Sequence, residues 1–325
     1  MDESIFKSRV DLTKLSEQVK KIKEEIGKVI VGQEDMIDLL VTAMLADGHV
    51  LIEGVPGVAK TLTAKLFSKI ISVDFSRIQF TPDLMPSDVV GTSVFNVKKS
   101  DFEFHPGPIF SNIVLIDEIN RAPAKTQAAL FEVMEERQVT VDGTTHPMKK
   151  PYIVLATQNP IEHEGTYRLP EAQLDRFIFK IVVQYPNLDE EVNIISRQHH
   201  RAGSLAVEEV NPIISAEEII SIKAFTQHVH VEEPLIRYIA QIVQETRNNP
   251  MLFLGASPRA SVAILNGAKA FALIQGRDFI NPEDIKKIAL PVLRHRIVLS
   301  PEKEMEGISP DTIVQQIIDK IEVPR

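Results

Sequence analysis

Five short runs of apolar residues alternate with helical segments in the first part of the chain, and this alternation restricts the possible fold more than any other feature. The runs are His49–Glu53, Phe75–Phe80, Ile113–Ile116, Tyr152–Ala156 and Phe177–Val183. Continuous apolar runs of this length are typical of strands that are buried on both faces. The sequence therefore predicts an α/β fold in which helices cover both faces of a five-stranded parallel sheet.

Two segments interrupt this alternation. In Ser93–Phe104 and Gln138–Met148, apolar and polar residues alternate on either side of turn signals at Lys98–Asp101 and Asp142–Gly143. A strand pattern on both sides of a turn is typical of a β-hairpin. We interpret both segments as β-hairpins inserted into the sheet domain.

Helices are predicted before and after the sheet. Two amphipathic helices precede the first strand, with Leu15, Val19, Ile22 and Ile26 on one and Met36, Ile37, Leu40 and Met44 on the other. After Tyr185-Pro186-Asn187 the strand pattern ends, and helices are predicted at Leu188–His199, Ser215–Val229, Glu233–Asn248, Ser257–Gln275 and Pro282–Val298. Ser215 with Glu218, and Asn281 followed by Pro282, are typical helix starts. We expect a sheet domain at residues 1–187 and a smaller helical domain at residues 188–325.

Charge and composition argue against several classes of protein. The formal net charge of −9 disfavours non-specific nucleic-acid binding, which depends on cationic side chains that displace counterions from phosphates. The chain has no cysteine, so disulfides and zinc–thiolate sites are excluded. Met1–Thr13 lacks the apolar core of an export signal, and no apolar run is long enough to span a membrane. We expect a soluble protein located in the cytoplasm.

The segment Gly54-Val55-Pro56-Gly57-Val58-Ala59-Lys60-Thr61 lies directly after a predicted strand and directly before a helix. In this context, backbone N–H groups and the helix N-terminus bind phosphates. Lys60 would contact the β and γ phosphates, and the Thr61 hydroxyl would bind magnesium, which prefers hard oxygen ligands. The generic pattern has glycine before the lysine, where this chain has Ala59. An ordinary strand-to-helix turn is the alternative.

A second element is the apolar strand Ile113–Ile116, which ends in Asp117 and Glu118. This is a Walker B arrangement. Asp117 would orient the magnesium shell, and Glu118 would polarise the attacking water, because phosphoryl transfer depends on positioning and on charge stabilisation. The alternative is a helix N-terminus, where the dipole favours acidic residues.

Three further residues stand where a nucleotide could be sensed, although each also has an ordinary explanation. Asn159 ends the next strand and would lie between the γ-phosphate and the attacking water, or would simply form an Asn-Pro turn. Arg176 precedes the last strand, and Arg259 follows Pro258 at a helix start. Arginines at such positions are often solvated surface charges.

The order of these motifs resembles that of AAA+ ATPases, and within them the MoxR branch, which is related to the ATPase subunit of magnesium chelatase. The likeness runs from about Lys28 to Val298 and is most specific in four stretches. They are Gly54–Thr61 with its unusual Ala59, Leu115–Pro123, Ala156–Pro160 and Leu169–Phe177. The chain departs from the family at Arg168, where proline is usual; this cation could join the subunit interface or be solvated, and we favour a solvated side chain.

This resemblance implies a P-loop NTPase core of the AAA+ type, with inserted hairpins and a smaller all-helical lid. It implies that Val31 and Gly32 lie near the adenine of ATP. It also implies that Asn159 is sensor 1, that Arg176 is an arginine finger offered to a neighbouring subunit, and that Arg259 is similar to sensor 2. The remaining nucleotide contacts expected are Gly54, Val55, Pro56, Gly57, Val58, Ala59, Lys60, Thr61, Leu62 and Asp117, with magnesium held by Thr61 and Asp117.

On this resemblance, the protein is expected to bind ATP and Mg²⁺ and to hydrolyse ATP as a homo-oligomer, in a hexameric ring. It would remodel a protein client during complex assembly or metal-cofactor insertion, together with a partner that has a von Willebrand factor A domain. Both hairpins would face the pore and contact the client. The alternatives are a nucleic-acid motor or helicase loader, with ATPase activity that DNA stimulates and salt weakens, and a nucleotide-dependent assembly switch that seldom hydrolyses ATP.

The histidine clusters are His199–His200, His228 with His230, and Arg294-His295-Arg296. They lack carboxylates at the spacing of metal ligands. We therefore predict that they lie at the surface and do not bind a metal.

Overall fold

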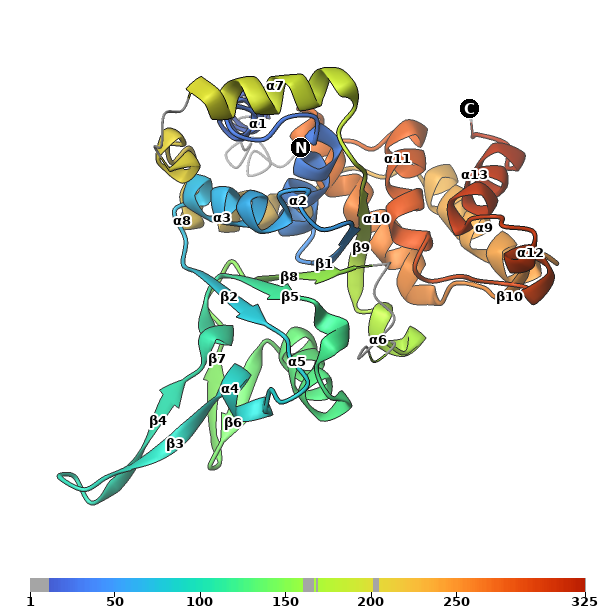
Figure 1. Ribbon diagram of the computed structural model, residues 1–325. Coiled ribbons are helices and arrows are strands. Elements are labelled where there is room, and N and C mark those ends of the chain that lie inside the picture. Colours follow the sequence, from blue (N-terminus) through green and yellow to red (C-terminus); the bar gives the residue numbers. More distant parts are fainter. Residues whose placement is uncertain (1–11, 160–166, 168, 201–204, 325) are drawn as a thin grey trace, which may run out of the picture.

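The computed structural model describes residues 12–159, 167, 169–200 and 205–324. Five parallel strands form the central sheet in the spatial order β2-β5-β8-β1-β9 (Figure 1). Their bounds are β1 His49–Gly54, β2 Phe75–Gln79, β5 Ile113–Asp117, β8 Ile153–Gln158 and β9 Phe177–Val183. The predicted α/β fold and all five predicted strands are confirmed. The connection after β1 leads to one edge of the sheet and the connection after β8 leads to the other, and ligands bind at the C-terminal ends of such a strand pair.

Both faces of the three central strands β5, β8 and β1 are buried, which explains their long apolar runs. The edge strand β2 does not follow the prediction of burial on both faces, because only its Ile78 is buried. In β5, Ile113 and Leu115 belong to one apolar cluster, whereas Val114 and Ile116 belong to a second cluster on the other face. The first cluster includes residues of the helices α1 Leu12–Gly27, α2 Glu34–Leu45 and α3 Lys60–Ile71, and the second includes residues of α4 Pro86–Val90 and α5 Ala124–Glu136. Successive strand residues point to opposite faces, so a strand covered on both sides is apolar at every position.

The two predicted hairpins are confirmed. The first pairs β3 Gly91–Asn96 with β4 Asp101–Pro106 and projects away from the body of the molecule (Figure 1). The second pairs β6 Gln138–Val141 with β7 Thr144–Pro147. The rings of Phe104 and His146 stack with centroids 4.4 Å apart, so the two hairpins contact each other at their bases.

Helices predominate after β9. They are α7 Leu188–His200, α8 Ala216–Thr226, α9 Glu233–Asn248, α10 Pro258–Ile274, α11 Pro282–Leu293, α12 Pro301–Met305 and α13 Pro310–Lys320, whereas the short helix α6 Glu171–Leu174 precedes β9. Short 3₁₀ helices lie at Pro108–Phe110, Ile119–Arg121 and Ala206–Glu209. The predicted capping box of Ser215 with Glu218 begins α8, and the predicted N-cap Asn281, followed by Pro282, begins α11 and forms a capping box with Asp284. No helix among the described residues is long and apolar enough to cross a membrane.

The prediction that a helix extends from Pro282 to Val298 was wrong, because α11 ends at Leu293. Val298 belongs to β11 Val298–Leu299, which pairs antiparallel with β10 Leu252–Leu254. Apolar residues near Val298 suit either a helix or a strand, and pairing with a partner about 45 residues away decides between them. The helices α12 and α13 were not predicted.

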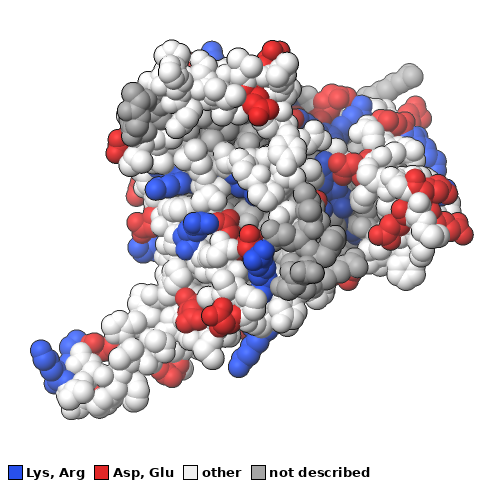
Figure 2. Space-filling model, viewed as in Figure 1, with Lys and Arg blue, Asp and Glu red and all other residues white. Residues whose placement is uncertain are grey.

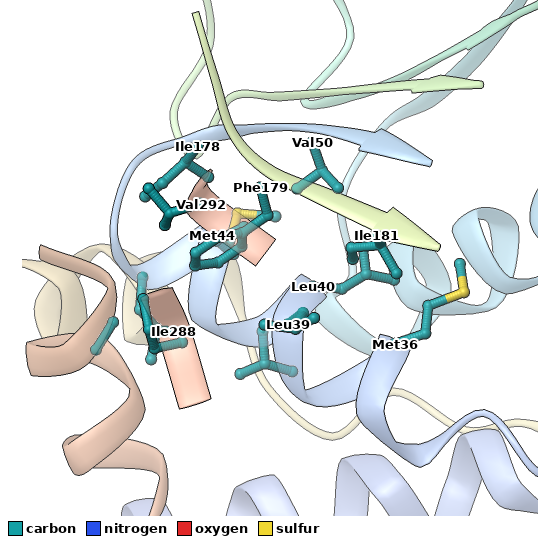
Figure 3. Packing of buried hydrophobic residues seen from close by; sticks show 14 of the residues in the cluster. Met36, Leu39, Leu40, Met44, Val50, Ile178, Phe179, Ile181, Ile288 and Val292 are labelled. Atoms are coloured by element: carbon teal, nitrogen blue, oxygen red, sulfur yellow. The ribbon is translucent and has the colours of Figure 1, made fainter. Parts of the chain in front are cut away.

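The apolar core continues past residue 187. Met44 of α2, Phe179 of β9 and Val292 of α11 gather in the same part of the larger apolar cluster (Figure 3). In Figure 1, α7 lies beside α1. The division into domains 1–187 and 188–325 therefore stays a prediction.

Candidate functional site

The phosphate-loop segment connects β1 to α3 at the C-terminal edge of the sheet. β1 ends at Gly54 and α3 begins at Lys60. Gly54 packs closely on β9, since a Cβ there would lie 2.8 Å from the Val183 carbonyl oxygen. Ala59 caps α3 in the left-handed conformation, with φ 57° and ψ 20°. This conformation explains why glycine is usual at that position, because a Cβ disfavours it.

Lys60 extends back across the loop, where its ammonium group donates a hydrogen bond to the Gly54 carbonyl oxygen. The loop backbone therefore surrounds a cation at the N-terminus of a helix, and both features favour a bound anion. The sequence-predicted residues from Gly54 to Leu62 all lie in this loop or in the first turn of α3.

A cavity of about 970 Å³ adjoins the loop, large enough for a nucleotide. It brings together the predicted residues Val31, Gly32, Gly57, Val58, Ala59 and Leu62. Gln33 connects the segment of Val31 and Gly32 to the phosphate loop, because its amide group donates to the Val58 carbonyl oxygen at 2.9 Å. The apolar side chains in the lining suit a nucleobase.

The segment after β9 and helix α11 also line the cavity, which sequence reasoning missed. α11 contributes Lys287, Leu290 and Pro291, and Arg294 follows directly after it. Burial lowers the pKa of Arg294, and Asp311, whose carboxylate lies 2.9 Å from its guanidinium, acts in the opposite direction. No local signal marks these residues, since α11 lies more than 200 positions after the phosphate loop in the chain.

Asp117 and Thr61 come together at the same sheet edge. An oxygen of Asp117 lies 3.5 Å from the Thr61 hydroxyl and 2.6 Å from Arg77 Nε. Its other oxygen accepts a hydrogen bond from Thr157 at 3.1 Å. A carboxylate and a hydroxyl are the hard oxygen donors that Mg²⁺ prefers, so these residues fit a magnesium site.

Glu118 turns directly away from the strand in the left-handed conformation, with φ 58° and ψ 54°. Its backbone N–H donates to the Thr157 hydroxyl at 3.1 Å. Its carboxylate accepts from the Gln79 amide at 2.9 Å and pairs with Arg121 at 3.0 Å. Such backbone strain at a non-glycine residue is common at functional sites.

Arg77 and Gln79 were missed by sequence reasoning. They lie two residues apart near the end of β2, and Gln79 is in register with Asp117 of the adjacent strand β5. Polar residues at alternate positions near the end of this edge strand were a usable signal, because alternate residues of a strand face the same side of the sheet.

Asn159 directly follows β8, the neighbour of β5 in the sheet, and is 8% exposed. The end of β8 therefore carries it to the same edge as Asp117. Residues 160–166 and Arg168, whose solvated side chain was predicted, lie outside the described residues.

Arg176 and Arg259 come together with each other, at a place separate from the nucleotide cavity. A Glu135 oxygen lies 3.7 Å from Arg176 Nε, and the other lies 3.3 Å from an Arg259 nitrogen. Arg176 also donates to the Phe131 carbonyl oxygen and lies over the Phe131 ring at 5.8 Å. Neither arginine is among the described residues that line the cavity.

The sheet geometry explains this separation. Arg176 immediately precedes β9, so it lies at the N-terminal edge of the sheet, whereas Asp117 and the phosphate loop lie at the C-terminal edge. β9 has seven residues, and a strand of that length spans about 20 Å. Within one copy of the chain, Arg176 is therefore too far from the phosphate loop to contact a nucleotide there.

Comparisons with known proteins agree with this geometry. Residues 49–179 match the model of the ATPase family associated with various cellular activities, and residues 244–317 match an AAA lid domain. The Bacillus subtilis protein YeaC is 49% identical over 94% of both chains. The chaperone MoxR1 of Mycobacterium tuberculosis is 42% identical over 93% of this chain and 81% of its own. A crystal structure of a Cytophaga hutchinsonii protein superimposes with a TM-score of 0.91 at 41% identity and covers all of both chains. The chain therefore belongs to the MoxR family of AAA+ ATPases.

Proposed function

We propose that this protein hydrolyses ATP in a magnesium-dependent reaction and that each complete site forms between two copies of the chain. The observation that best supports this proposal is the separation between the two sheet edges. Thr61, Asp117 and Glu118 meet at one edge, and Arg176 and Arg259 share Glu135 near the other. Arginines that cannot serve their own nucleotide are free to serve that of a neighbour.

Each residue at the C-terminal edge has a role that follows from its chemistry. The loop backbone and Lys60 hold the phosphates, which replace the Gly54 carbonyl oxygen as the partner of the ammonium group. Thr61 and Asp117 hold magnesium, which neutralises charge on the phosphates when bound. Glu118 orients the attacking water and accepts its proton, and Asn159 positions that water by a hydrogen bond.

The arginines act from the neighbouring copy. Negative charge spreads over the γ-phosphate oxygens in the transition state, and two guanidinium groups there stabilise it. Comparable arginine fingers in GTPases accelerate hydrolysis about 10³–10⁵-fold. We therefore expect a ring of copies, hexameric in this proposal, in which an isolated subunit is slow.

The test of the chemical step is Glu118→Gln. The amide keeps the size of the side chain but cannot accept a proton, so turnover should fall at least about tenfold while ATP still binds. ATPase rates and the binding of a fluorescent ATP analogue measure the two effects. Glu132→Gln, an exposed acid on α5, is the control. Unchanged turnover of assembled Glu118→Gln would refute the assignment.

We further propose that the ring remodels a protein client, in complex assembly or metal-cofactor insertion, in the cytoplasm and with a von Willebrand factor A domain partner. The 42% identity to a protein named chaperone MoxR1 supports a chaperone role. The projecting hairpin supports a protein client, since Phe95 and Phe102 on it are exposed. On the face shown in Figure 2, basic side chains are mixed with acidic ones, which does not favour nucleic acid.

Client capture is the matching experiment. Glu118→Gln should hold ATP and keep the client bound, so cross-linking in cells followed by mass spectrometry should enrich specific proteins over wild type. Recovery of DNA or RNA in place of protein would contradict the proposed client class.

A further inference from the structure

Arg296 lies three residues after the end of α11 and is 8% exposed. A guanidinium has five N–H donors, and in Arg296 each of them has a hydrogen-bond acceptor. The acceptors are a carboxylate oxygen of Asp175 at 2.7 Å and the carbonyl oxygens of Asp175 at 3.0 Å, Phe177 at 2.6 Å, Ile178 at 3.1 Å and Val292 at 2.6 Å. This corrects the prediction that Arg294-His295-Arg296 is a surface cluster, because His295 is buried as well.

Two of the residues that accept hydrogen bonds from Arg296 are the chain neighbours of Arg176. The carbonyl groups of Asp175 and Phe177 flank Arg176 directly, and one nitrogen of Arg296 donates to both. His295 contacts the Phe177 carbonyl oxygen too, at 3.0 Å. The backbone on both sides of Arg176 is therefore fixed to the chain that follows α11.

The carboxylate of Asp175 extends this connection to the second arginine. Its other oxygen accepts a hydrogen bond from the Ser257 hydroxyl at 2.9 Å. Ser257 is the N-cap of α10, and its hydroxyl oxygen accepts from the backbone N–H of Arg259 at 3.2 Å. One partly buried carboxylate thus connects the backbone before Arg176 with the backbone of Arg259.

The side chains of the two arginines have fewer polar partners than a buried guanidinium such as that of Arg296. Arg176 donates to the Phe131 carbonyl oxygen, but its Nε has no hydrogen-bond partner among the described residues, and Glu135 lies 3.7 Å from it. The Arg259 side chain is 57% exposed and pairs with the same Glu135. Fixed backbones thus set the positions from which both cations can exchange Glu135 for an external anion.

We propose that Asp175 and Arg296 are positioning residues that hold Arg176 and Arg259 at a fixed spacing, so that both contact the same nucleotide on a neighbouring copy. The inference rests on the proposed function of the two arginines. Asp175 and Arg296 act through the backbone and do not contact the nucleotide. If the Asp175–Arg296 pair were purely structural, breaking it would lower stability alone. If the pair positions the arginines, breaking it lowers turnover while nucleotide binding stays unchanged.

The first test is Asp175→Asn in the full-length, assembled protein. The variant removes the charge that pairs with Arg296 but keeps the side-chain shape, so kcat for ATP should fall at least tenfold while KM changes less than threefold. Light scattering checks that assembly is intact. The matched control is Asp284→Asn, which breaks a buried pair with Arg277, at 2.7 and 2.6 Å, away from both arginines. It should lower Tm and leave kcat unchanged.

A double-mutant cycle separates positioning from general damage. In an Arg176→Ala, Arg259→Ala background, Asp175→Asn should change kcat less than twofold, because the groups that it positions are gone. This inference alone would be overturned if Asp175→Asn lowered kcat by the same factor in the wild-type and the doubly substituted backgrounds. Full turnover of the single variant Asp175→Asn would overturn it as well. Full turnover of assembled Arg176→Ala, Arg259→Ala would overturn the proposed function and this inference with it.

If Asp175→Asn does not fold, Arg296→Lys serves instead. Lysine keeps the positive charge but offers only three donors in place of the guanidinium fork. Its kcat should fall at least fivefold, again at unchanged KM and with the same dependence on the two arginines. Wild-type kcat in a folded Arg296→Lys variant contradicts the inference.

Discussion

At the scale of single residues, polar contacts that join distant parts of the chain determine the site. Thr157 shows this best: its hydroxyl donates to the Asp117 carboxylate and accepts from the Glu118 backbone N–H. The end of β8 thereby fixes the conformation of the acidic turn after β5. Loss of this hydroxyl would leave the Glu118 N–H without this acceptor and one oxygen of the Asp117 carboxylate without this donor, although the other oxygen keeps Arg77.

Ala59 carries a backbone conformation that disfavours a side chain, and this leads to a stability prediction. The left-handed conformation costs about 1–2 kcal/mol for a residue with a Cβ, and glycine loses about 0.5–1 kcal/mol through its greater freedom in the unfolded chain. Ala59→Gly should therefore raise the free energy of unfolding by about 0.5 kcal/mol, as measured by urea denaturation, at unchanged ATP affinity.

The control for this substitution is Ala240→Gly, at an exposed position inside α9. Glycine in a helix interior costs about 1 kcal/mol relative to alanine. A loss of stability in Ala59→Gly that equals the loss in Ala240→Gly would contradict the argument from the left-handed conformation.

The sequence identified the motif residues of the site but not their partners. Gly54–Thr61 and Asp117–Glu118 could be predicted because strand, turn and helix signals are local and their spacing is specific. Arg77 and Gln79 left a signal in the alternation of β2, but their pairing with Asp117 and Glu118 depends on strand order. Glu135 could not be placed beside Arg176 and Arg259, because these contacts depend on helix packing. The burial of Arg296 was missed for the same reason, since Asp175 lies 121 positions away in the chain.

At the scale of helices and strands, hydrophobic pattern was a reliable guide wherever an element is buried on a regular face. The five strands and both hairpins follow from it, since β-strand side chains alternate between faces. The pattern failed after Leu293, where a two-residue strand pairs with β10 and the apolar residues lack a distinct period. Short elements depend on their partners more than on their own sequence.

His49 joins three elements and makes the fold sensitive to acid. Its Nδ1 accepts from the Val154 N–H of β8 at 2.9 Å, and its Nε2 donates to the Met134 carbonyl oxygen of α5 at 3.0 Å. Burial, and then the nearby charge of Arg137, lower the pKa of His49 to about 4. A protonated ring would point an N–H at the Val154 N–H, so the folded state holds the neutral form.

The direction of the pH effect follows from the proton balance. Between an unfolded-state pKa of about 6.5 and the folded-state pKa of about 4, the unfolded chain binds the proton and the folded chain does not. Stability should therefore fall as pH decreases through this window, by about tenfold in the unfolding equilibrium per pH unit from this group. Urea denaturation at pH 7 and pH 5 measures it.

The variant His49→Gln should show a smaller loss of stability between pH 7 and pH 5 than wild type, because it removes one titrating group. His230→Gln, an exposed histidine, is the control and should match wild type. Identical pH profiles for His49→Gln and wild type would contradict the assignment.

At the scale of the whole molecule, the proposed catalytic groups lie at opposite edges of the sheet, so a complete site needs two copies of the chain. If Arg176 serves a neighbour, Arg176→Ala damages the site of the adjacent subunit, whereas Glu118→Gln damages its own. Two inactive variants can then combine into a ring in which some interfaces join an intact Glu118 to an intact Arg176.

Mixing the variants tests this directly. Arg176→Ala and Glu118→Gln should each have at least about tenfold lower turnover than wild type, and an equimolar mixture after subunit exchange should recover part of the activity. A mixture that stays at the level of the separate variants, with exchange verified by fluorescence, would place both residues in one site of one copy.

Glu135 gives Arg176 and Arg259 an internal anion, and this has a consequence for how copies recognise each other. Whatever a neighbour presents must attract Arg176 and Arg259 more strongly than a single carboxylate that is already in place. A triphosphate carries more negative charge than Glu135, and a site without nucleotide presents no phosphate. Contact between copies would thus depend on whether the neighbour has bound nucleotide. Glu135 would keep both arginines unless a neighbouring copy presents a bound triphosphate.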